Sequence, residues 1–368
     1  MEGDCIMAHD KKVDFHSHYL SPTYYEYLDR FEDEKPDSFP TPKWSLEEHL
    51  ALMDRFGVAF SLISVSSPNL SRADRETEKT MVHQINIEGK GYVDQHPDRL
   101  GLFAGLPLPH VEDALEEATF ALDELNCDGF SLTTNYAGMY LGDPALDPLM
   151  RFLNDRNAVV AIHPTKPAGL PQGVNEDVPI PAMEFLIDTT RTFTFMVMNN
   201  VFERFPQIRW IFPHAGAFVS FLSDRMNGFA VLMKQDRPDL PLDFHGDMKH
   251  VYYDVAGFPL QKQLQALLKD VKIDNLLYGS DTPYTPDIAC TALSGGLEDI
   301  NWLNDGEKAK LFCGNAVALI PRLAGILEID SDGKSISYAE HPLTRKEKRN
   351  RRRRALISKM YGILFNDA

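Results

Sequence analysis

Short apolar runs alternate with longer amphipathic stretches along most of the chain. The runs are continuous, as in AVVAI at 158–162 and NLLY at 275–278, and do not alternate between apolar and polar residues. Continuous runs are typical of parallel strands that helices cover. We predict eight strands, at Lys12–His16, Val58–Ser64, Leu100–Leu106, Gly129–Thr133, Ala158–His163, Ile208–His214, His250–Val255 and Asn275–Ser280.

The stretches between these runs have helical periodicity. We predict helices at Ser45–Phe56, Arg72–Gln95, Val111–Leu125, Ala145–Arg156, Pro181–Phe205, Ala217–Lys234, Leu260–Lys269, Asp287–Asp299 and Gly306–Leu319. Strand-then-helix units that repeat in this way favour an α/β fold, a closed (β/α)8 TIM barrel. The alternative is a doubly wound open sheet. It has less support because Ser17–Leu20, and no glycine-rich loop, follows the first strand.

The barrel is predicted to occupy residues 1–326, and residues 327–368 form a C-terminal extension that includes a basic run. Two small insertions interrupt the barrel pattern. Asp29–Lys43 is polar with three prolines, and Pro164–Pro179 is rich in proline and glycine. Both follow predicted strands, on the side of a barrel where active-site loops are found.

The charge is unevenly distributed along the chain. The net charge is −17, but residues 345–354 carry eight basic residues and one acid, which leaves the rest near −24. A body this acidic argues against non-specific nucleic-acid binding. The four cysteines show no CxxC spacing, no run is long enough to span a membrane, and Met1–Asp10 does not resemble a signal peptide. We therefore predict a cytoplasmic protein.

Histidine or aspartate ends four of the predicted strands, in the motifs VDFHSH, VVAIH, WIFPH and YGSD. His16 and His18 are two positions apart, so both side chains can point to one face of a strand. Together with His163 and Asp281 they form a nitrogen and oxygen donor set that suits Zn²⁺, Mn²⁺ or Fe²⁺. Each residue alone could be an ordinary strand-end or turn residue. Their coincidence at one rim of the barrel predicts a metal site.

These motifs identify a family resemblance that runs from about Lys12 to Leu323. The chain resembles the amidohydrolase superfamily, within it the branch of aminocarboxymuconate-semialdehyde decarboxylase, and most closely the 6-methylsalicylate decarboxylases. The resemblance rests on VDFHSH, HLALMDRFGV, DRLGLFAGLPLP, AIHP, FERFPQIRWIFPHAGAF, GSDTPY and GNAVAL. It implies that His16, His18, His163 and Asp281 are metal ligands and that His214 is catalytic.

Differences between this sequence and other branches of the superfamily narrow the expected number of metal ions and the expected substrate. No lysine follows the fourth predicted strand between Asp128 and Arg151, where binuclear members of the superfamily place a carbamylated lysine, so we expect one divalent metal ion. Zinc is the first choice and manganese the second. The His-x-His pair and Ala217 differ from the resorcylate decarboxylases. The insertion Asp29–Lys43 is short and mostly acidic, unlike the basic insert of the aminocarboxymuconate enzymes, which argues against a dicarboxylate substrate.

The predicted activity is non-oxidative decarboxylation of a hydroxybenzoate, with 6-methylsalicylate converted to m-cresol and CO2. Asp281 is the first candidate for the proton donor and His214 the second, while Tyr284 is expected to flank the aromatic ring. The resemblance also implies a homodimer in which Arg225 reaches the partner's site to bind the substrate carboxylate; a surface ion pair with Asp224 is the alternative.

Two other functions stay open from the sequence. The same ligands could activate water to hydrolyse a lactone or an amide. Alternatively, the chain could be a non-catalytic metal-binding or partner-binding protein, with the basic run Arg345–Arg354 as a docking or nuclear-localisation segment. In the simplest interpretation of that run, it is a solvated helix that lies on the acidic barrel.

Overall fold

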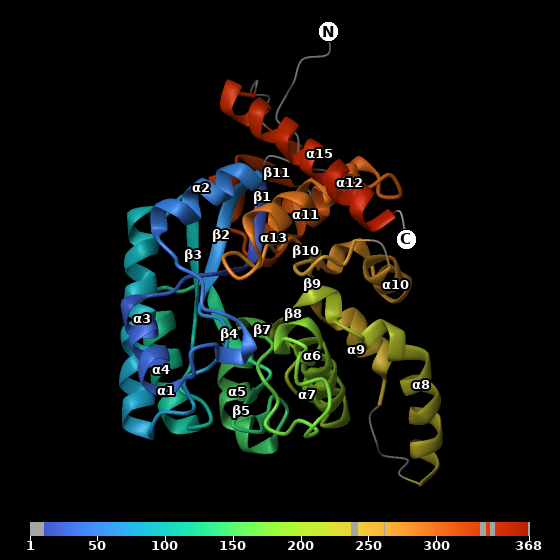
Figure 1. The fold of residues 1–368 in the computed structure, drawn as a ribbon. Helices are drawn as coiled ribbons and strands as arrows, with labels where there is room; N and C mark the ends of the chain where they lie inside the picture. The colour runs from blue at the N-terminus through green and yellow to red at the C-terminus, as the bar shows by residue number, and fades with distance from the viewer. Residues whose placement is uncertain (1–10, 237–241, 261, 332–335, 339–342, 367–368) are drawn as a thin grey trace.

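Eight parallel strands form the centre of the computed structural model, which describes residues 11–236, 242–260, 262–331, 336–338 and 343–366 (Figure 1). Neighbouring strands pair in the order β1-β2-β3-β4-β7-β8-β9-β10. Their bounds are β1 Lys12–His18, β2 Val58–Ser64, β3 Leu100–Ala104, β4 Gly129–Thr133, β7 Val159–His163, β8 Arg209–Phe212, β9 Tyr252–Asp254 and β10 Leu276–Leu277. The N-terminal segment Met1–Asp10, with Cys5, lies outside the described residues.

The ring of strands closes between β1 and the segment that follows β10. The N–H of Phe15 donates to the carbonyl of Tyr278 at 2.9 Å, and the N–H of His18 donates to that of Thr282 at 2.8 Å. Ser17 and Thr282 also form an isolated parallel bridge. These contacts confirm the predicted TIM barrel and exclude the open-sheet alternative.

Helices surround the strands, as Figure 1 shows. They are α1 Pro22–Phe31, α2 Leu46–Phe56, α3 Arg75–Gln95, α4 Val111–Asp123, α5 Asp147–Asp155, α6 Ile180–Met198, α7 Val201–Arg204, α8 Val219–Asp236, α9 Phe244–His250, α10 Gln263–Asp270, α11 Asp287–Asp299, α12 Asp305–Ala309, α13 Asn315–Leu319, α14 Leu323–Leu327 and α15 Arg345–Asn366. No helix in the described part of the chain is long and apolar enough to cross a membrane.

Several predicted boundaries were wrong, and local backbone geometry explains them. The predicted helix Pro181–Phe205 is two helices, α6 and α7, because Asn200 between them has a left-handed φ of 54°. The predicted helix Gly306–Leu319 is interrupted by a π-helical turn at Lys310–Gly314. The last strand, predicted to reach Ser280, ends at Leu277. Helices α1 and α9 and two short hairpins were not predicted.

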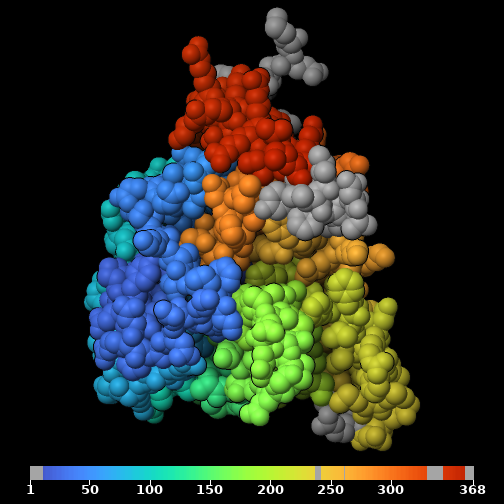
Figure 2. Space-filling view, in the orientation of Figure 1, coloured from blue at the N-terminus to red at the C-terminus, as the bar shows by residue number. Residues whose placement is uncertain are grey.

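The C-terminal helix α15 packs along α11 and α2, and Figure 2 shows it covering one end of the molecule. Its side chains bind backbone carbonyls at the end of α2, which otherwise lack helical partners. Asn350 donates to the carbonyl of Asp54 at 2.9 Å, and Arg354 donates to that of Arg55 at 3.1 Å. The expected C-terminal helical tail is therefore present; whether residues 327–368 form a separate unit stays a prediction.

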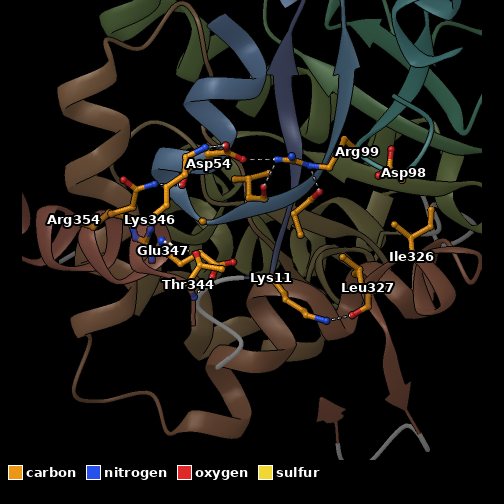
Figure 3. A pocket seen from close by; sticks show the side chains of 14 residues that line it. Lys11, Asp54, Asp98, Arg99, Ile326, Leu327, Thr344, Lys346, Glu347 and Arg354 are labelled. Atoms are coloured by element: carbon orange, nitrogen blue, oxygen red, sulfur yellow. Dashed lines mark hydrogen bonds and ion pairs between the residues drawn. The ribbon is translucent and has the colours of Figure 1, made fainter. Parts of the chain in front are cut away.

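A cavity of about 470 Å³ lies between α15 and the barrel, away from the candidate metal site (Figure 3). Charged side chains cross it in pairs: Asp54 accepts from Arg99 at 3.0 Å and from Lys346 of α15 at 2.5 Å. Lys11, on the opposite wall, donates to the carbonyl of Leu327. The contact between α15 and this end of the barrel is therefore partly polar, unlike an apolar core.

Candidate metal centre

The structure brings His16, His18, His163 and Asp281 together at one end of the barrel. His16 and His18 lie at the end of β1, His163 ends β7, and Asp281 follows β10. One ligand atom from each residue lies within 4.8 Å of those of the others. The three histidines are almost completely buried. A divalent metal ion fits between donors that converge in this way.

Hydrogen bonds orient all three imidazoles with Nε2 towards the common point. Nδ1–H of His16 donates to Asp254 at 2.8 Å, and Nδ1–H of His163 donates to the carbonyl of Pro164 at 2.7 Å. His18 has its Nδ1 3.3 Å from the hydroxyl of Ser64. Nε2 of His16 and of His18 is buried and forms no hydrogen bond with the described residues. Buried nitrogens without partners are costly unless they bind a ligand, so these atoms fit a metal.

Opposite charges perturb the acidity of the four residues. Burial alone lowers the pKa of His16, but Asp254 and Asp281 raise that pKa well above its ordinary value. Burial raises the pKa of Asp281, but the imidazoles of His16 and His18, with Nε2 3.5 and 3.4 Å from its Oδ1, hold that pKa well below its usual range. Burial and the neighbouring histidines lower the pKa of His163. Asp281 is thus a carboxylate beside the imidazoles of His18 and His163, whose lowered pKa values favour the neutral form that binds metals.

Two buried aspartates support the site, and the sequence analysis missed both. Asp254 at the end of β9 accepts from Nδ1 of His16 and, through its other oxygen, from the backbone N–H of His214 at 3.1 Å. Asp14 accepts from the backbone N–H groups of His16 and Ser280, at 3.0 and 3.1 Å. For Asp254 the sequence did contain a signal: in VYYDVA, at 251–256, an acid stands at the end of an apolar predicted strand.

The backbone near the candidate site is strained at several non-glycine residues. His214, Ala215 and Ala217 have φ values of 55°, 50° and 54°, and Asp281 has a φ of 62°. Left-handed conformations cost energy in non-glycine residues and cluster at functional sites. At Gly257 a Cβ atom would approach the ring of His214 to 2.7 Å, so this position needs glycine. The chain thus holds His214 and Asp281 in fixed, unfavourable backbone conformations beside the position where the four proposed metal ligands converge.

A pocket of about 440 Å³ opens over these residues. His163, His214 and Asp281 lie in its wall, together with Tyr284, whose ring lies 5.7 Å from that of His18. Nδ1 of His214 is buried and without a hydrogen bond among the described residues. The other walls are largely apolar and are formed by Pro36, Phe39, Pro179, Pro181, Ala182, Phe185, Leu186 and Pro286. A flat aromatic molecule fits a pocket with this lining.

Arg225 does not join this pocket in its own chain. It is exposed on α8, where its guanidinium lies 5.1 Å from the centre of the Phe229 ring. The alternative ion pair with Asp224 is not formed, since Arg225 has no ion pair within the described part of the chain. Figure 1 shows α8 projecting away from the barrel.

The family model described as amidohydrolase matches residues 13–322. The 6-methylsalicylic acid decarboxylase of Aspergillus aculeatus is 30% identical, over 85% of this chain and 96% of the relative. A solved amidohydrolase II superposes with a TM-score of 0.81 at 38% identity, covering 84% of this chain and all of the other. A dihydroxybenzoic acid decarboxylase of Polaromonas, solved with manganese and 2-nitroresorcinol, shares the fold at a TM-score of 0.70 and 18% identity, covering 84% and 96%.

These findings confirm the predicted resemblance, and with it the expected class of enzyme, a carboxy-lyase. The matched segment contains the three histidines, Asp281 and His214, and it ends before the basic run of α15. The chain belongs to the amidohydrolase family, and its curated relatives place it in the decarboxylase branch.

Proposed function

We propose that this chain removes CO2 from a 2-hydroxybenzoate without oxidation, and that 6-methylsalicylate, which would give m-cresol, is the first compound to test. One observation carries the proposal: four side chains that could hold a metal ion converge within 4.8 Å, and two of them, His163 and Asp281, line a mostly apolar pocket of about 440 Å³. The decarboxylases among the relatives support the same chemistry.

The proposed ligands are His16, His18, His163 and Asp281, and they would hold one divalent ion. When bound, the ion supplies positive charge to the phenolic and carboxylate oxygens of the substrate. Zinc is the first choice because three imidazoles and a carboxylate suit it; the manganese in the Polaromonas enzyme supports manganese as the second.

The chain's own residues position the substrate and move a proton. Tyr284 and the apolar walls orient the ring and exclude water. As the bond between ring and carboxylate breaks, CO2 leaves and its electron pair stays on the ring carbon, which then receives a proton from Asp281 or from His214. The low pKa of Asp281 opposes its role as an acid, and burial also lowers the pKa of His214. His214→Gln with its metal content verified, assayed in single-turnover protonation, distinguishes the two donors: retained protonation assigns the role to Asp281, and lost protonation assigns it to His214.

The proposed assembly is a homodimer formed through α8. Its exposed face carries apolar side chains at helical spacing, and Arg225 lies between them. An arginine that lies outside its own pocket but at such a face is placed to reach the partner's pocket, where its guanidinium would bind the substrate carboxylate. A cytoplasmic location stays a prediction.

The proposal is tested on purified full-length protein by metal analysis and by turnover. We expect about one equivalent of zinc or manganese per chain, and release of CO2 and m-cresol from 6-methylsalicylate that stops after chelation and returns with metal. His163→Ala should lose both metal and activity. Lactone or amide hydrolysis, with no CO2 from any hydroxybenzoate, would replace the proposal by the hydrolase alternative. Native protein without metal would contradict both enzymatic functions.

A further inference from the structure

A carboxylate from outside the metal site lines the same pocket. Asp37 belongs to the short helical turn Pro36–Ser38 in the loop between α1 and α2, and it lies in the wall with Phe39 and Thr41. Most of the surrounding wall is apolar. A charged group in such a wall is costly unless it forms hydrogen bonds, so its presence calls for a partner.

Asp37 is held in a fixed position. Its Oδ2 accepts from the hydroxyl of Ser67 at 2.6 Å, and that hydroxyl lies 2.7 Å from the hydroxyl of Thr165. Ser67 and Thr165 are both buried. Asp37 also has a left-handed φ of 52°, a conformation that a non-glycine residue keeps only when its surroundings enforce it. The protein thus builds a rigid, costly arrangement in order to present this carboxylate.

Two residues, Ser66 and Tyr284, lie between Asp37 and the proposed metal ligands. Ser66, adjacent to the Ser67 that binds Asp37, has its hydroxyl 3.2 Å from Nε2 of His163. The ring of Tyr284 packs against that of His18. Burial raises the pKa of the Tyr284 hydroxyl, the charge of Asp37 raises it further, and the charge of Asp281 adds a smaller increase. Tyr284 therefore lies in the field of both carboxylates. A ring bound beside His163 and Asp281 would share its pocket with Asp37.

The carboxylate of Asp37 has capacity for a further donor. An ionised carboxylate offers about four acceptor sites, and the bonds from the Ser67 hydroxyl and from the backbone N–H of Lys166 use two of them. Burial raises the pKa of Asp37, while the Ser67 hydroxyl and the charges of Lys166 and Arg72 oppose this. A neutral donor on the ligand, such as a phenolic hydroxyl, would satisfy the group, whereas a second carboxylate would be repelled.

We propose that Asp37 determines substrate specificity by accepting a hydrogen bond from a second ring hydroxyl, so that the enzyme prefers dihydroxybenzoates to 2-hydroxybenzoates with one hydroxyl. The inference rests on the proposed function and refines its substrate class. 6-Methylsalicylate, which carries one hydroxyl, is then a poorer substrate than an analogue with a second hydroxyl. Ser67 acts as a positioning residue for Asp37.

The test compares substrates that differ by one hydroxyl, on enzymes that differ by one carboxylate. The substrates are 2-hydroxybenzoate and its 2,4-, 2,5- and 2,6-dihydroxy analogues. For at least one analogue we expect wild-type kcat/KM to exceed that for 2-hydroxybenzoate by about 10-fold or more, the effect of one hydrogen bond to a charged group. In Asp37→Ala the ratio of kcat/KM for the dihydroxy analogue to that for 2-hydroxybenzoate should fall to within about threefold.

Matched variants separate specificity from folding. Asp33→Ala removes an exposed aspartate of the same segment and should keep the wild-type preference. Ser67→Ala should weaken the preference without abolishing turnover of 2-hydroxybenzoate. An equal preference ratio in wild type and Asp37→Ala, or no preferred dihydroxy analogue in the wild type, would overturn the proposal.

A binding measurement decides the role of Asp37 without turnover. In calorimetry on metal-loaded protein, resorcinol should bind wild type about 10-fold more tightly than phenol, and Asp37→Ala should bind the two equally. If no hydroxybenzoate releases CO2, the proposed function fails, and the resorcinol-to-phenol ratio still supports or overturns the specificity of the pocket for a second hydroxyl.

Discussion

The carboxylate of Asp254 accepts the Nδ1–H of His16 at 2.8 Å and, with its second oxygen, the backbone N–H of His214 at 3.1 Å. One side chain therefore fixes both a proposed metal ligand and the proposed catalytic histidine. Its pKa is lowered: burial raises it, but the charge and hydrogen bond of His16 outweigh this, so Asp254 is a charged acceptor. The orientation of His16 and the position of His214 depend on the same group.

Asp254→Asn is therefore expected to weaken metal binding by about 10- to 100-fold, the usual effect of removing an acceptor behind a ligand histidine. The amide can rotate to accept from only one of the two donors. Metal content after dialysis against graded chelator, together with kcat, measures the effect. Asp94→Asn, an exposed aspartate on α3, is the control and should match wild type. Unchanged metal affinity in Asp254→Asn would contradict the orienting role.

The sequence predicted best those features that depend on a local residue pattern, namely the strands and the residues at their ends. The short stretches VAFSLIS and GFSLT predicted β2 and β4 with their observed bounds, since both are rich in apolar residues and too short for a helix. The residues at the strand ends came together for the same reason: parallel strands of a barrel end at one rim. Arg225 was named through the resemblance and Tyr284 as a wall for the aromatic ring, and of the two only Tyr284 lies at the pocket of its own chain.

The burial of Arg354, the position of Asp37 and the end of α6 could not be predicted, because they depend on the fold and not on a local sequence pattern. Arg354 ends a run of four arginines, yet it is 1% exposed while Arg353 beside it is exposed. Asp37 is one of several acids in a polar segment, and only folding places it in the pocket wall. The end of α6 depends on the left-handed conformation of Asn200, which the sequence permits but does not require.

The burial of Arg354 predicts that the basic run has a structural role. Its Nε donates to Glu298 at 2.8 Å, and Lys12 donates to the same carboxylate oxygen at 2.6 Å. Removing one partner from a buried ion pair typically costs about 3–5 kcal/mol. We expect Arg354→Ala to lower the free energy of unfolding by about 3 kcal/mol in urea denaturation. Arg353→Ala, the exposed neighbour, should change it by less than about 0.5 kcal/mol. Equal effects would favour a run that acts only as a solvated docking segment.

A buried glutamate far from the metal predicts a pH dependence of stability. Glu78 of α3 is 1% exposed, and burial followed by the charge of Asp113 raises its pKa to about 8. The folded chain thus holds this proton more tightly than the unfolded chain. The associated stability is complete below the ordinary pKa of 4.5 and is lost as the pH rises towards 8.

Glu78→Gln removes the loss of stability at high pH, because glutamine has no proton to release. Relative to wild type, the variant should gain up to about 4 kcal/mol in the free energy of unfolding between pH 5 and pH 8.5, measured by urea denaturation at each pH. Glu76→Gln, which replaces an exposed glutamate in the same first turn, is the matched control. A Glu78→Gln difference that stays constant with pH would contradict a raised pKa at this position.

The exposed face of α8 predicts the assembly. Phe221, Phe229 and Leu232 are 58%, 47% and 54% exposed, at helical spacing on a helix that projects from the body (Figures 1 and 2). Apolar side chains gathered in this way usually mark an interface. We expect a dimer in sedimentation velocity, and a monomer after Phe221→Glu with Leu232→Glu. Ile288→Glu, an equally exposed apolar residue on α11, should remain dimeric.

Mixing two inactive variants then shows which chain's pocket Arg225 serves. Arg225→Ala lacks the guanidinium, and His163→Ala lacks a proposed ligand. If Arg225 acts in the partner's pocket, a mixed dimer has one complete site, formed by the metal ligands of the first variant and Arg225 of the second. Random re-association should then restore about a quarter of wild-type activity, because half of the dimers are mixed and each has one working site of two. If Arg225 acts within its own chain, the mixed dimer has no complete site and activity stays at the level of the separate variants.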